Sequence, residues 1–126
     1  YYYLNETKKP PVQALRDQGI PIAVATDLNP GTAPMASILL AMNQVCVLFG
    51  LTPEEALKGV TQFGAMALGL TDRGVLQVGK KADFVLWDIQ HPAELAYGIN
   101  LVSPGAIWQH GQCHFKSPLL QKKDSE

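Results

Sequence analysis

The apolar segment at residues 20–25 constrains the fold of this chain more than any other feature of its sequence. Its side chains are apolar without alternation, which is typical of a parallel strand buried on both faces, and Pro21 is tolerated near the start of a strand. Before it, Pro10 and Pro11 open a short helix, and Gly19 supplies the left-handed residue that ends one. A helix, a tight glycine turn and a buried strand predict an α/β fold, either a barrel or a doubly wound sheet.

The later elements are expected in the order helix, helix and then hairpins. Apolar spacing predicts a helix over residues 34–49, and the sequence Thr52-Pro53-Glu54-Glu55 is a capping box that begins the next helix. A further helical stretch ends at residues 68–69. The pattern then changes to a short strand at 74–78 and a strand of alternating exposure at 82–88. A loop or helical turn follows at 91–98, and then a hairpin of 106–109 and 112–115.

Composition excludes several classes of protein. With 47% hydrophobic and 17% charged residues, the chain is globular rather than disordered. Ten basic residues against eleven acidic ones give a net charge of −1, so there is no electrostatic case for binding nucleic acid or an anionic membrane. The longest apolar stretch, residues 33–42, is well short of the ~18–20 residues that span a bilayer. Residues 1–6 hold no charged-then-apolar leader, so we expect no secretion signal.

A polar loop directly follows the predicted strand, and Asp27 is its outstanding residue. In α/β sheets and barrels, reactive groups gather on the loops where parallel strands end. A carboxylate there can ligate a metal or accept a proton from a metal-bound water. Asn29 adds an amide, Gly31 lets a ligand approach backbone N–H groups, and the helix expected from Pro34 favours an anion at its start. An alternative that the spacing favours equally is that Asp27 and Thr32 only cap a turn and the next helix.

The histidines and cysteines give a weaker signal for chemistry. His91 precedes a proline in a predicted loop, and His110 and His114 are separated by the expected hairpin turn rather than sharing a helix face. A role on the surface or in turns is therefore favoured over metal binding for all three. Cys46 and Cys113 have neither CxxC nor metal-type spacing, which predicts reduced thiols and a cytoplasmic protein.

Four stretches of the chain are similar to one known family. They are the loop Ala25-Thr26-Asp27-x-Asn29-Pro30-Gly31, the run from Leu51-Thr52-Pro53-Glu54-Glu55-Ala56 to Ala67-Leu68-Gly69, the block Gly74-x-Leu76-x-x-Gly79-Lys80-x-Ala82-Asp83-Phe84-Val85-Leu86-Trp87-Asp88, and the stretch His91-Pro92-Ala93-Glu94-Leu95-x-Tyr97. On these residues the chain resembles the imidazolonepropionases, metal-dependent amidohydrolases of histidine degradation. The block that begins at Gly74 is common to amidohydrolases in general, whereas the first and last stretches are more particular to imidazolonepropionases.

The resemblance implies a function for the polar loop. Asp27 corresponds to the aspartate of the last barrel strand, which coordinates zinc or iron and helps to activate the attacking water. Asn29 and Gly31 correspond to positions that bind the product, N-formimino-L-glutamate, and Thr32 to a contact with the substrate, 4-imidazolone-5-propanoate. The resemblance implies a small-molecule substrate, no nucleic-acid or membrane partner, and a homo-oligomeric parent enzyme, taken here as a homodimer.

The resemblance also implies an incomplete fold. The fold class is α/β, with residues 1–70 as the last strand and helices of a TIM (β/α)8 barrel, residues 71–116 as hairpins of a small β-sandwich, and residues 117–126 as a polar tail. Family members carry further histidines and substrate-binding residues upstream, and a whole barrel takes about 200–250 residues. We therefore expect the C-terminal third of an enzyme, truncated in its gene or in the expressed piece and inactive by itself. Gly64 and Met66 depart from the helix usual in the family, which affects packing but not the site.

Two alternatives stay open. The block that begins at Gly74 is general enough to fit another amidohydrolase that acts on a cyclic amide or an amidine. A catalytically inactive remnant that serves as an interaction module would also lack the upstream ligands. An assay of the full-length protein that compares imidazolone propanoate with a panel of cyclic amides distinguishes an imidazolonepropionase from another amidohydrolase. The coding sequence upstream distinguishes an enzyme from an inactive remnant.

Overall fold

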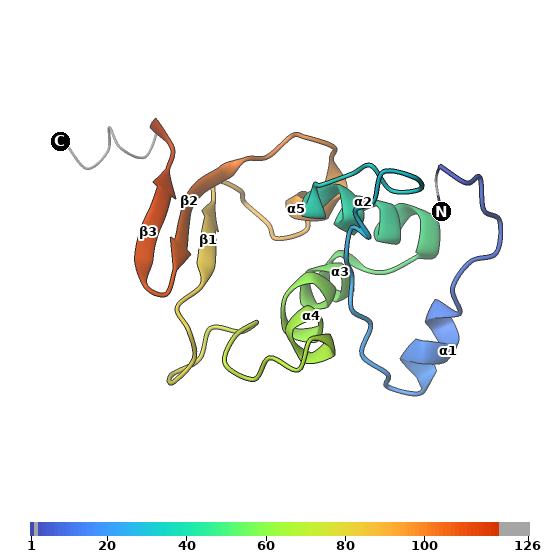
Figure 1. The fold of residues 1–126 in the computed structure, drawn as a ribbon, viewed down its shortest axis with the longest axis horizontal. Coiled ribbons are helices and arrows are strands. Elements are labelled where there is room, and N and C mark those ends of the chain that lie inside the picture. Colours follow the sequence, from blue (N-terminus) through green and yellow to red (C-terminus); the bar gives the residue numbers. More distant parts are fainter. Residues whose placement is uncertain (2, 119–126) are drawn as a thin grey trace.

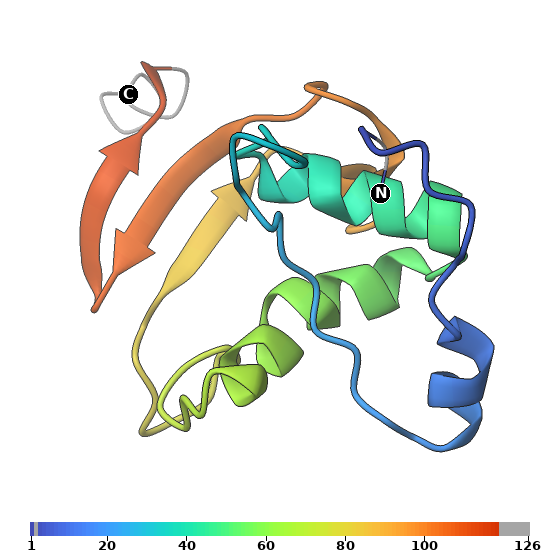
Figure 2. The same cartoon turned by 45° about the vertical axis from the view of Figure 1, so that its right-hand side comes forward.

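The computed structural model describes residue 1 and residues 3–118. Along the chain the elements are α1 (Val12–Asp17), α2 (Ile38–Phe49), α3 (Pro53–Val60), α4 (Gln62–Ala67), β1 (Phe84–Trp87), α5 (Glu94–Tyr97), β2 (Pro104–Gln109) and β3 (Gln112–Lys116). The three strands form one sheet at one end of the molecule, the helices α2 to α5 fill the middle, and α1 lies at the opposite end (Figure 1). The rotated view in Figure 2 separates α2 from α3 and α4, which lie below it.

Local capping signals fix the ends of α2 and α3. The Ser37 hydroxyl accepts the Leu40 N–H at 3.2 Å at the start of α2, and Gly50 ends this helix in the left-handed conformation, with φ of 76°. The predicted capping box of α3 is confirmed, because Glu55 N–H donates to the Thr52 hydroxyl and Thr52 N–H donates to the Glu55 carboxylate, at 3.2 and 2.8 Å.

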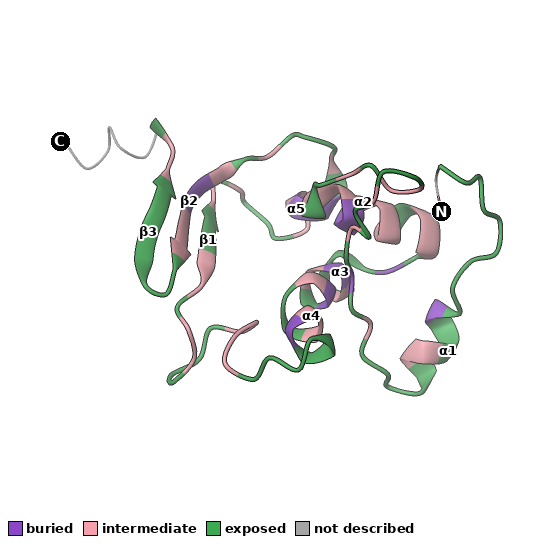
Figure 3. Ribbon diagram, viewed as in Figure 1, coloured by how far each residue is buried: buried purple, intermediate pink, exposed green. Residues whose placement is uncertain are grey.

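Two clusters of buried side chains hold the helices together. The first consists of Val12, Val24, Ala41 and Leu51, and it joins α1 and the segment 20–25 to α2. The second consists of Met42, Ala56, Leu95 and Ala96, and it joins α2, α3 and α5. Trp87 of β1 packs against the second cluster and so attaches the sheet to the helices. Figure 3 shows the same distribution, with buried residues on the helices and on β2 and a largely exposed β3.

The predicted closing hairpin is confirmed, and it belongs to an antiparallel sheet in the order β1-β2-β3. His110 and Gly111 connect β2 to β3 with φ of 51° and 76°, and a two-residue hairpin turn of type I′ requires positive φ at both positions. The rings of Phe84 and Trp108 stack across β1 and β2, 4.9 Å apart and inclined by 11°. Asp83 Oδ1 accepts the His110 N–H at 2.8 Å, which ties the turn to the start of β1.

The predicted strand at residues 20–25 is wrong for this structure, which has an irregular segment there. Val24 N–H donates to the Gly59 carbonyl of α3 at 3.0 Å, but no segment among the described residues lies beside 20–25 as a paired strand. A strand exists only with a hydrogen-bonded neighbour, so apolar sequence alone cannot make one. Burial on both faces is also wrong, because Val24 is buried while Ile20 is 50% exposed.

Three further boundaries differ from prediction. The stretch 74–78 forms bends and turns, with Gly74 at φ of 90°, instead of a strand. The strand predicted over 82–88 is shorter, since β1 covers only Phe84–Trp87. Exposure does not alternate along it, because the two end residues are half-buried and the two central ones are exposed. Helix α2 begins at Ile38 rather than at 34, because the chain before it closes on itself, with Met35 N–H donating to the Ala33 carbonyl at 2.7 Å.

The other predicted helical features are confirmed. A helix follows Pro11, α4 ends just before Gly69, and a short helix, α5, follows Pro92. No helix in residues 3–118 is long and apolar enough to cross a membrane. The barrel and sandwich assignments of 1–70 and 71–116 stay predictions, and most of the predicted polar tail, residues 119–126, lies outside the described residues.

Candidate functional site

The loop after residue 25 is organised by the side chain of Asn29. Its Oδ1 accepts the backbone N–H groups of Gly31 and Thr32 at 3.0 and 2.8 Å, and the Thr32 hydroxyl at 3.1 Å. Its Nδ2 donates to the backbone carbonyl of Asp27 at 2.7 Å. One amide therefore joins the residues on both sides of it, in the manner of an Asx turn.

Backbone hydrogen bonds close the same loop. Asn29 N–H donates to the Ala33 carbonyl at 3.1 Å, and Ala33 N–H donates back to the Asn29 carbonyl at 3.3 Å. The loop thus carries a small hydrogen-bonded ring of its own, separate from α2. Its shape depends on contacts between residues that are close in sequence.

Asp27 has a left-handed backbone, with φ of 52°. Aspartate and asparagine tolerate this conformation better than other non-glycine residues. Asp27 is exposed, and together with Thr32 it lines a cavity of about 210 Å³ beside α2. Asn29 and Gly31 do not line this cavity. Two of the four predicted site residues, Asp27 and Thr32, therefore line the cavity, and the other two do not.

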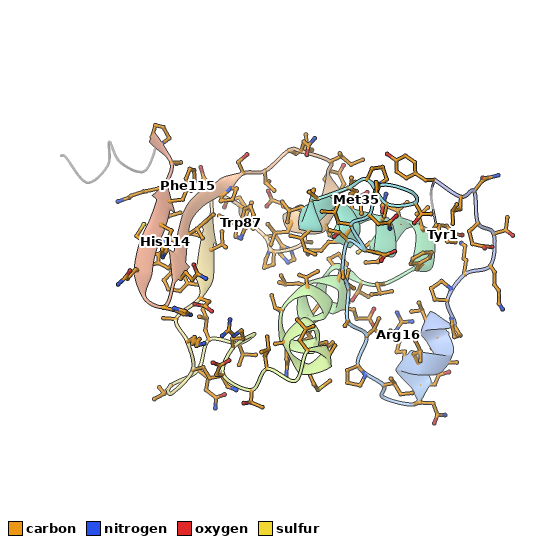
Figure 4. The ribbon with its side chains drawn as sticks, viewed as in Figure 1. Tyr1, Arg16, Met35, Trp87, His114 and Phe115 are labelled. Carbon is orange, nitrogen blue, oxygen red and sulfur yellow. The ribbon has the colours of Figure 1, made fainter. Side chains whose placement is uncertain are left out.

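The walls of the cavity are mainly apolar and come from three parts of the chain. They include Tyr1 and Tyr3 from the N-terminal segment, Met35 from the loop before α2, and Gln44 and Phe49 from α2 itself. The rings of Tyr1 and Phe49 meet edge to face, with centroids 4.7 Å apart and planes at 85°. In Figure 4, Met35 lies over α2 and Tyr1 lies at the end of the same helix. An apolar cavity with a few polar groups is typical of a small-molecule site.

The predicted anion site at the start of the following helix is wrong. Helix α2 begins after Ser37, whose hydroxyl already accepts the Leu40 N–H, so no helix start adjoins the loop. The N–H groups of Gly31 and Thr32, expected to be open to a ligand, donate to Asn29 instead. The alternative that Asp27 and Thr32 merely cap a turn is right that a side chain caps a turn here. The capping side chain is that of Asn29, however, and not that of Asp27 or Thr32. The Asn29-Pro30-Gly31 sequence was the signal for it, since asparagine before proline and glycine favours a turn.

His91 has the predicted role in a turn. Its Nδ1 accepts the Ala93 N–H at 3.1 Å, and Glu94 Oε1 accepts the N–H groups of Gln90 and His91, both at 2.8 Å, at the start of α5. His110 lies in the hairpin turn, and His114 lies exposed on β3. Across residues 3–118 no three His, Cys, Asp or Glu side chains gather in a way that could hold a metal ion.

An ion pair missed by sequence reasoning joins α1 to the start of α3. Arg16 of α1 donates from Nε and Nη2 to the two carboxylate oxygens of Glu55, at 2.7 and 2.8 Å. The Arg16 guanidinium, helped by the Thr52 N–H, lowers the pKa of Glu55 to about 2. Such bidentate pairs are strong for their class. They join residues far apart in sequence, so local pattern gives no sign of them.

Comparison with known proteins identifies the family. The model of the Amidohydrolase family matches residues 3–116, so the chain belongs to the amidohydrolase family. It is 59% identical over 112 residues to an imidazolonepropionase of Alteromonas mediterranea, and 63% identical over 102 residues to one of Chromobacterium violaceum. A third relative, the imidazolonepropionase of Hahella chejuensis, is 51% identical over 115 residues.

These matches cover most of this chain but a small part of each relative. They take in 89%, 80% and 90% of the chain and 27%, 25% and 28% of the three relatives, in the same order. The chain thus spans about a quarter of the length of the curated relatives it matches.

Amidohydrolases are generally metal-dependent, but the described residues do not fit a metal by themselves. A metal with a catalytic role usually takes about three protein ligands. The candidate loop offers one carboxylate, Asp27, and the three histidines lie in the turn before α5, in the hairpin and on β3. A metal site of this family would therefore need ligands beyond those of the described residues.

Proposed function

We propose that this chain is the part of an imidazolonepropionase that carries the last barrel strand, the helices after it and the sandwich hairpins. The parent enzyme hydrolyses 4-imidazolone-5-propanoate to N-formimino-L-glutamate. The observation that carries this proposal is an identity of 51–63% to imidazolonepropionases over most of the chain. Residues 20–25, which lack a paired neighbour among the described residues, would gain partner strands in that complete barrel.

Asp27 is the catalytic carboxylate in this proposal. It would contribute one ligand to a zinc or iron ion, and the other ligands would come from elsewhere in the parent enzyme. Such an ion supplies an activated water when it is bound. Asp27 accepts a proton from the attacking water and returns it to the ring nitrogen as the ring C–N bond breaks. Its exposure at the wall of the cavity favours this role.

Asn29, Gly31 and Thr32 form the loop that faces substrate and product in the proposed enzyme. Thr32 lines the cavity with Asp27, which favours a direct contact with the substrate. Asn29 and Gly31 belong to the same hydrogen-bonded loop and fix its shape. The parent enzyme is proposed to be a cytoplasmic homodimer, and the free thiols of Cys46 and Cys113 are in keeping with a reducing compartment.

A chimera tests the proposal without a complete parent chain. In it, the 112 matching residues of the Alteromonas mediterranea imidazolonepropionase are replaced by those of this chain. We expect the chimera to bind metal and to hydrolyse 4-imidazolone-5-propanoate, with the unmodified relative as the control. A folded, metal-loaded chimera that turns over cyclic amides such as hydantoin, but not imidazolone propanoate, would refute the proposed substrate.

The coding sequence upstream of residue 1 provides an independent check. An open reading frame with a His-x-His motif supports an enzyme. A stop codon followed by a new start codon would instead indicate an inactive remnant.

A further inference from the structure

We propose that the free edge of the segment 20–25, with an apolar groove beside α1, is the docking site of one extended apolar strand that runs parallel to the segment. The stretch of the parent enzyme directly before residue 1 supplies this strand. The proposal goes beyond the proposed function, because it assigns a partner to the segment and depends on no substrate.

The segment is extended, and one of its two edges is open. Its burial alternates, since Val24 is buried while Ala23 and Ala25 on either side of it are exposed, and a period of two is that of an extended chain. Val24 N–H donates to the Gly59 carbonyl of α3 at 3.0 Å. Backbone groups of successive residues in an extended chain point to opposite edges, so those of Ala23 and Ala25 point away from α3. Neither alanine has a backbone hydrogen bond to another of the described residues, which leaves this edge free to pair with a further strand.

A groove of about 220 Å³ lies along the same segment. Residues 22–25 form one wall, and the others include Val12 and Leu15 of α1 and Val45 and Phe49 of α2. Every residue that lines the groove is apolar. A parallel strand covered by protein on both faces is itself apolar almost without interruption, so such a strand has the chemistry that this groove accepts.

The position of Tyr1 sets the direction of the strand. Tyr1 lines the same cavity as Ala25 and Asp27, so the backbone at residue 1 lies near the carboxyl end of the segment 20–25. A strand that leads into Tyr1 therefore ends level with Ala25 and runs parallel to the segment. Residues 1–19, which include α1, then form the crossover between two parallel strands, and a helix is the usual crossover. The chain spans only about a quarter of the length of its relatives, so the parent enzyme has further residues to supply the strand.

An extended form of the chain tests the proposal without any assay of turnover. A stretch of about ten residues, enough for one strand, is added before Tyr1. Its sequence is that which directly precedes the matched region in the imidazolonepropionase of Alteromonas mediterranea. Amide hydrogen exchange at Ala23 and Ala25 should slow at least about fivefold relative to the unextended chain. The same ten residues in scrambled order are the control and should give no such protection.

A charge in the groove should abolish the effect. Leu15→Asp in the extended chain places a carboxylate in the lining of the groove, whereas the matched control Ala14→Asp places it on the exposed side of the same helix. Protection should be lost in the first variant and kept in the second, while slow exchange in α2 and α3 reports that the helices stay folded in both.

Three results would overturn the proposal. Unprotected Ala23 and Ala25 amides in the extended chain would show that no strand docks there, and equal protection by the scrambled stretch would show that the groove does not select its occupant. Protection in the unextended chain that disappears on dilution would assign the edge to a second copy of the chain. None of these results bears on the substrate, which the chimera tests separately.

Discussion

Replacing Gly59 with alanine tests whether the segment 20–25 lies directly against α3. A Cβ atom on Gly59 would lie 2.6 Å from Val24 Cγ2 and 3.0 Å from the Ile22 carbonyl oxygen. Ordinary van der Waals contact begins at 3.4 Å, so both neighbours would have to move. The Val24 side chain can move, but the Ile22 oxygen belongs to the backbone.

Two opposing terms set the size of the effect. Overpacking a filled site costs about 1–3 kcal/mol. Alanine in place of glycine stabilises a helix by up to about 1 kcal/mol. The net change is a destabilisation of about 1 kcal/mol in the chimera, measured as a lower urea midpoint at unchanged m-value. The direction of the change in the free energy of unfolding tests the packing, because alanine in place of a helical glycine that faced open space would stabilise the protein instead.

A double-mutant cycle identifies the atoms responsible. Val24→Ala removes the nearest methyl group, so Gly59→Ala should be less harmful, or stabilising, in that background. Additive effects of the two substitutions would refute the packing described here. A gain in stability for Gly59→Ala alone would do so too. Lys58→Ala, on the exposed side of α3, is the control for a change of side chain away from the segment 20–25, and it removes only an exposed ion pair with Glu54.

Three other substitutions or conditions have defined outcomes. Asp27→Asn in the chimera should lower kcat about 100- to 10,000-fold with an unchanged melting profile, and a variant with most of its activity would contradict the assigned role. Because the pKa of Glu55 is lowered from 4.5 to about 2 in the folded protein, its ion pair with Arg16 stabilises fully above pH 4.5, and this stability is lost as the pH falls from 4.5 towards 2. Glu55→Gln, which keeps a capping-box residue, should flatten urea midpoints over that window, and an unchanged pH profile would count against the pair. The isolated 126 residues should show no turnover, bind no metal stoichiometrically and either self-associate or fold incompletely. A monomer in ultracentrifugation with a cooperative melt and one tightly bound zinc would contradict this.

Elements specified by neighbouring residues could be predicted from the sequence. The capping box at Thr52 and the hairpin turn at His110-Gly111 depend on residue types a few positions apart, and both are confirmed. The segment 20–25 was different, because strand formation depends on partners that local sequence does not contain. The sequence predicts the start of α2 at residue 34 instead of 38, because hydrophobic spacing carries no information about the hydrogen-bonded ring at residues 29–33.

The candidate site also has features that the local sequence indicates and contacts that it does not. Asp27 was identified as the residue of interest because it follows an apolar segment, and the cavity beside it gives that choice a physical setting. The use of the Asn29 amide for the loop was within reach of sequence reasoning, through the Asn-Pro-Gly turn signal. The Arg16–Glu55 pair was not, because it joins positions that are 39 residues apart.

The self-contained ring at residues 29–33 has a consequence for protein engineering. Its hydrogen bonds run between residues 27 and 33, so the loop carries its own geometry and requires no particular helix after it. Loop closure over so few residues costs little chain entropy. Seven residues moved together to the end of a strand in an unrelated barrel should therefore keep the left-handed aspartate and its asparagine partner. Residues 27–33 can therefore be transferred as one unit that presents a carboxylate.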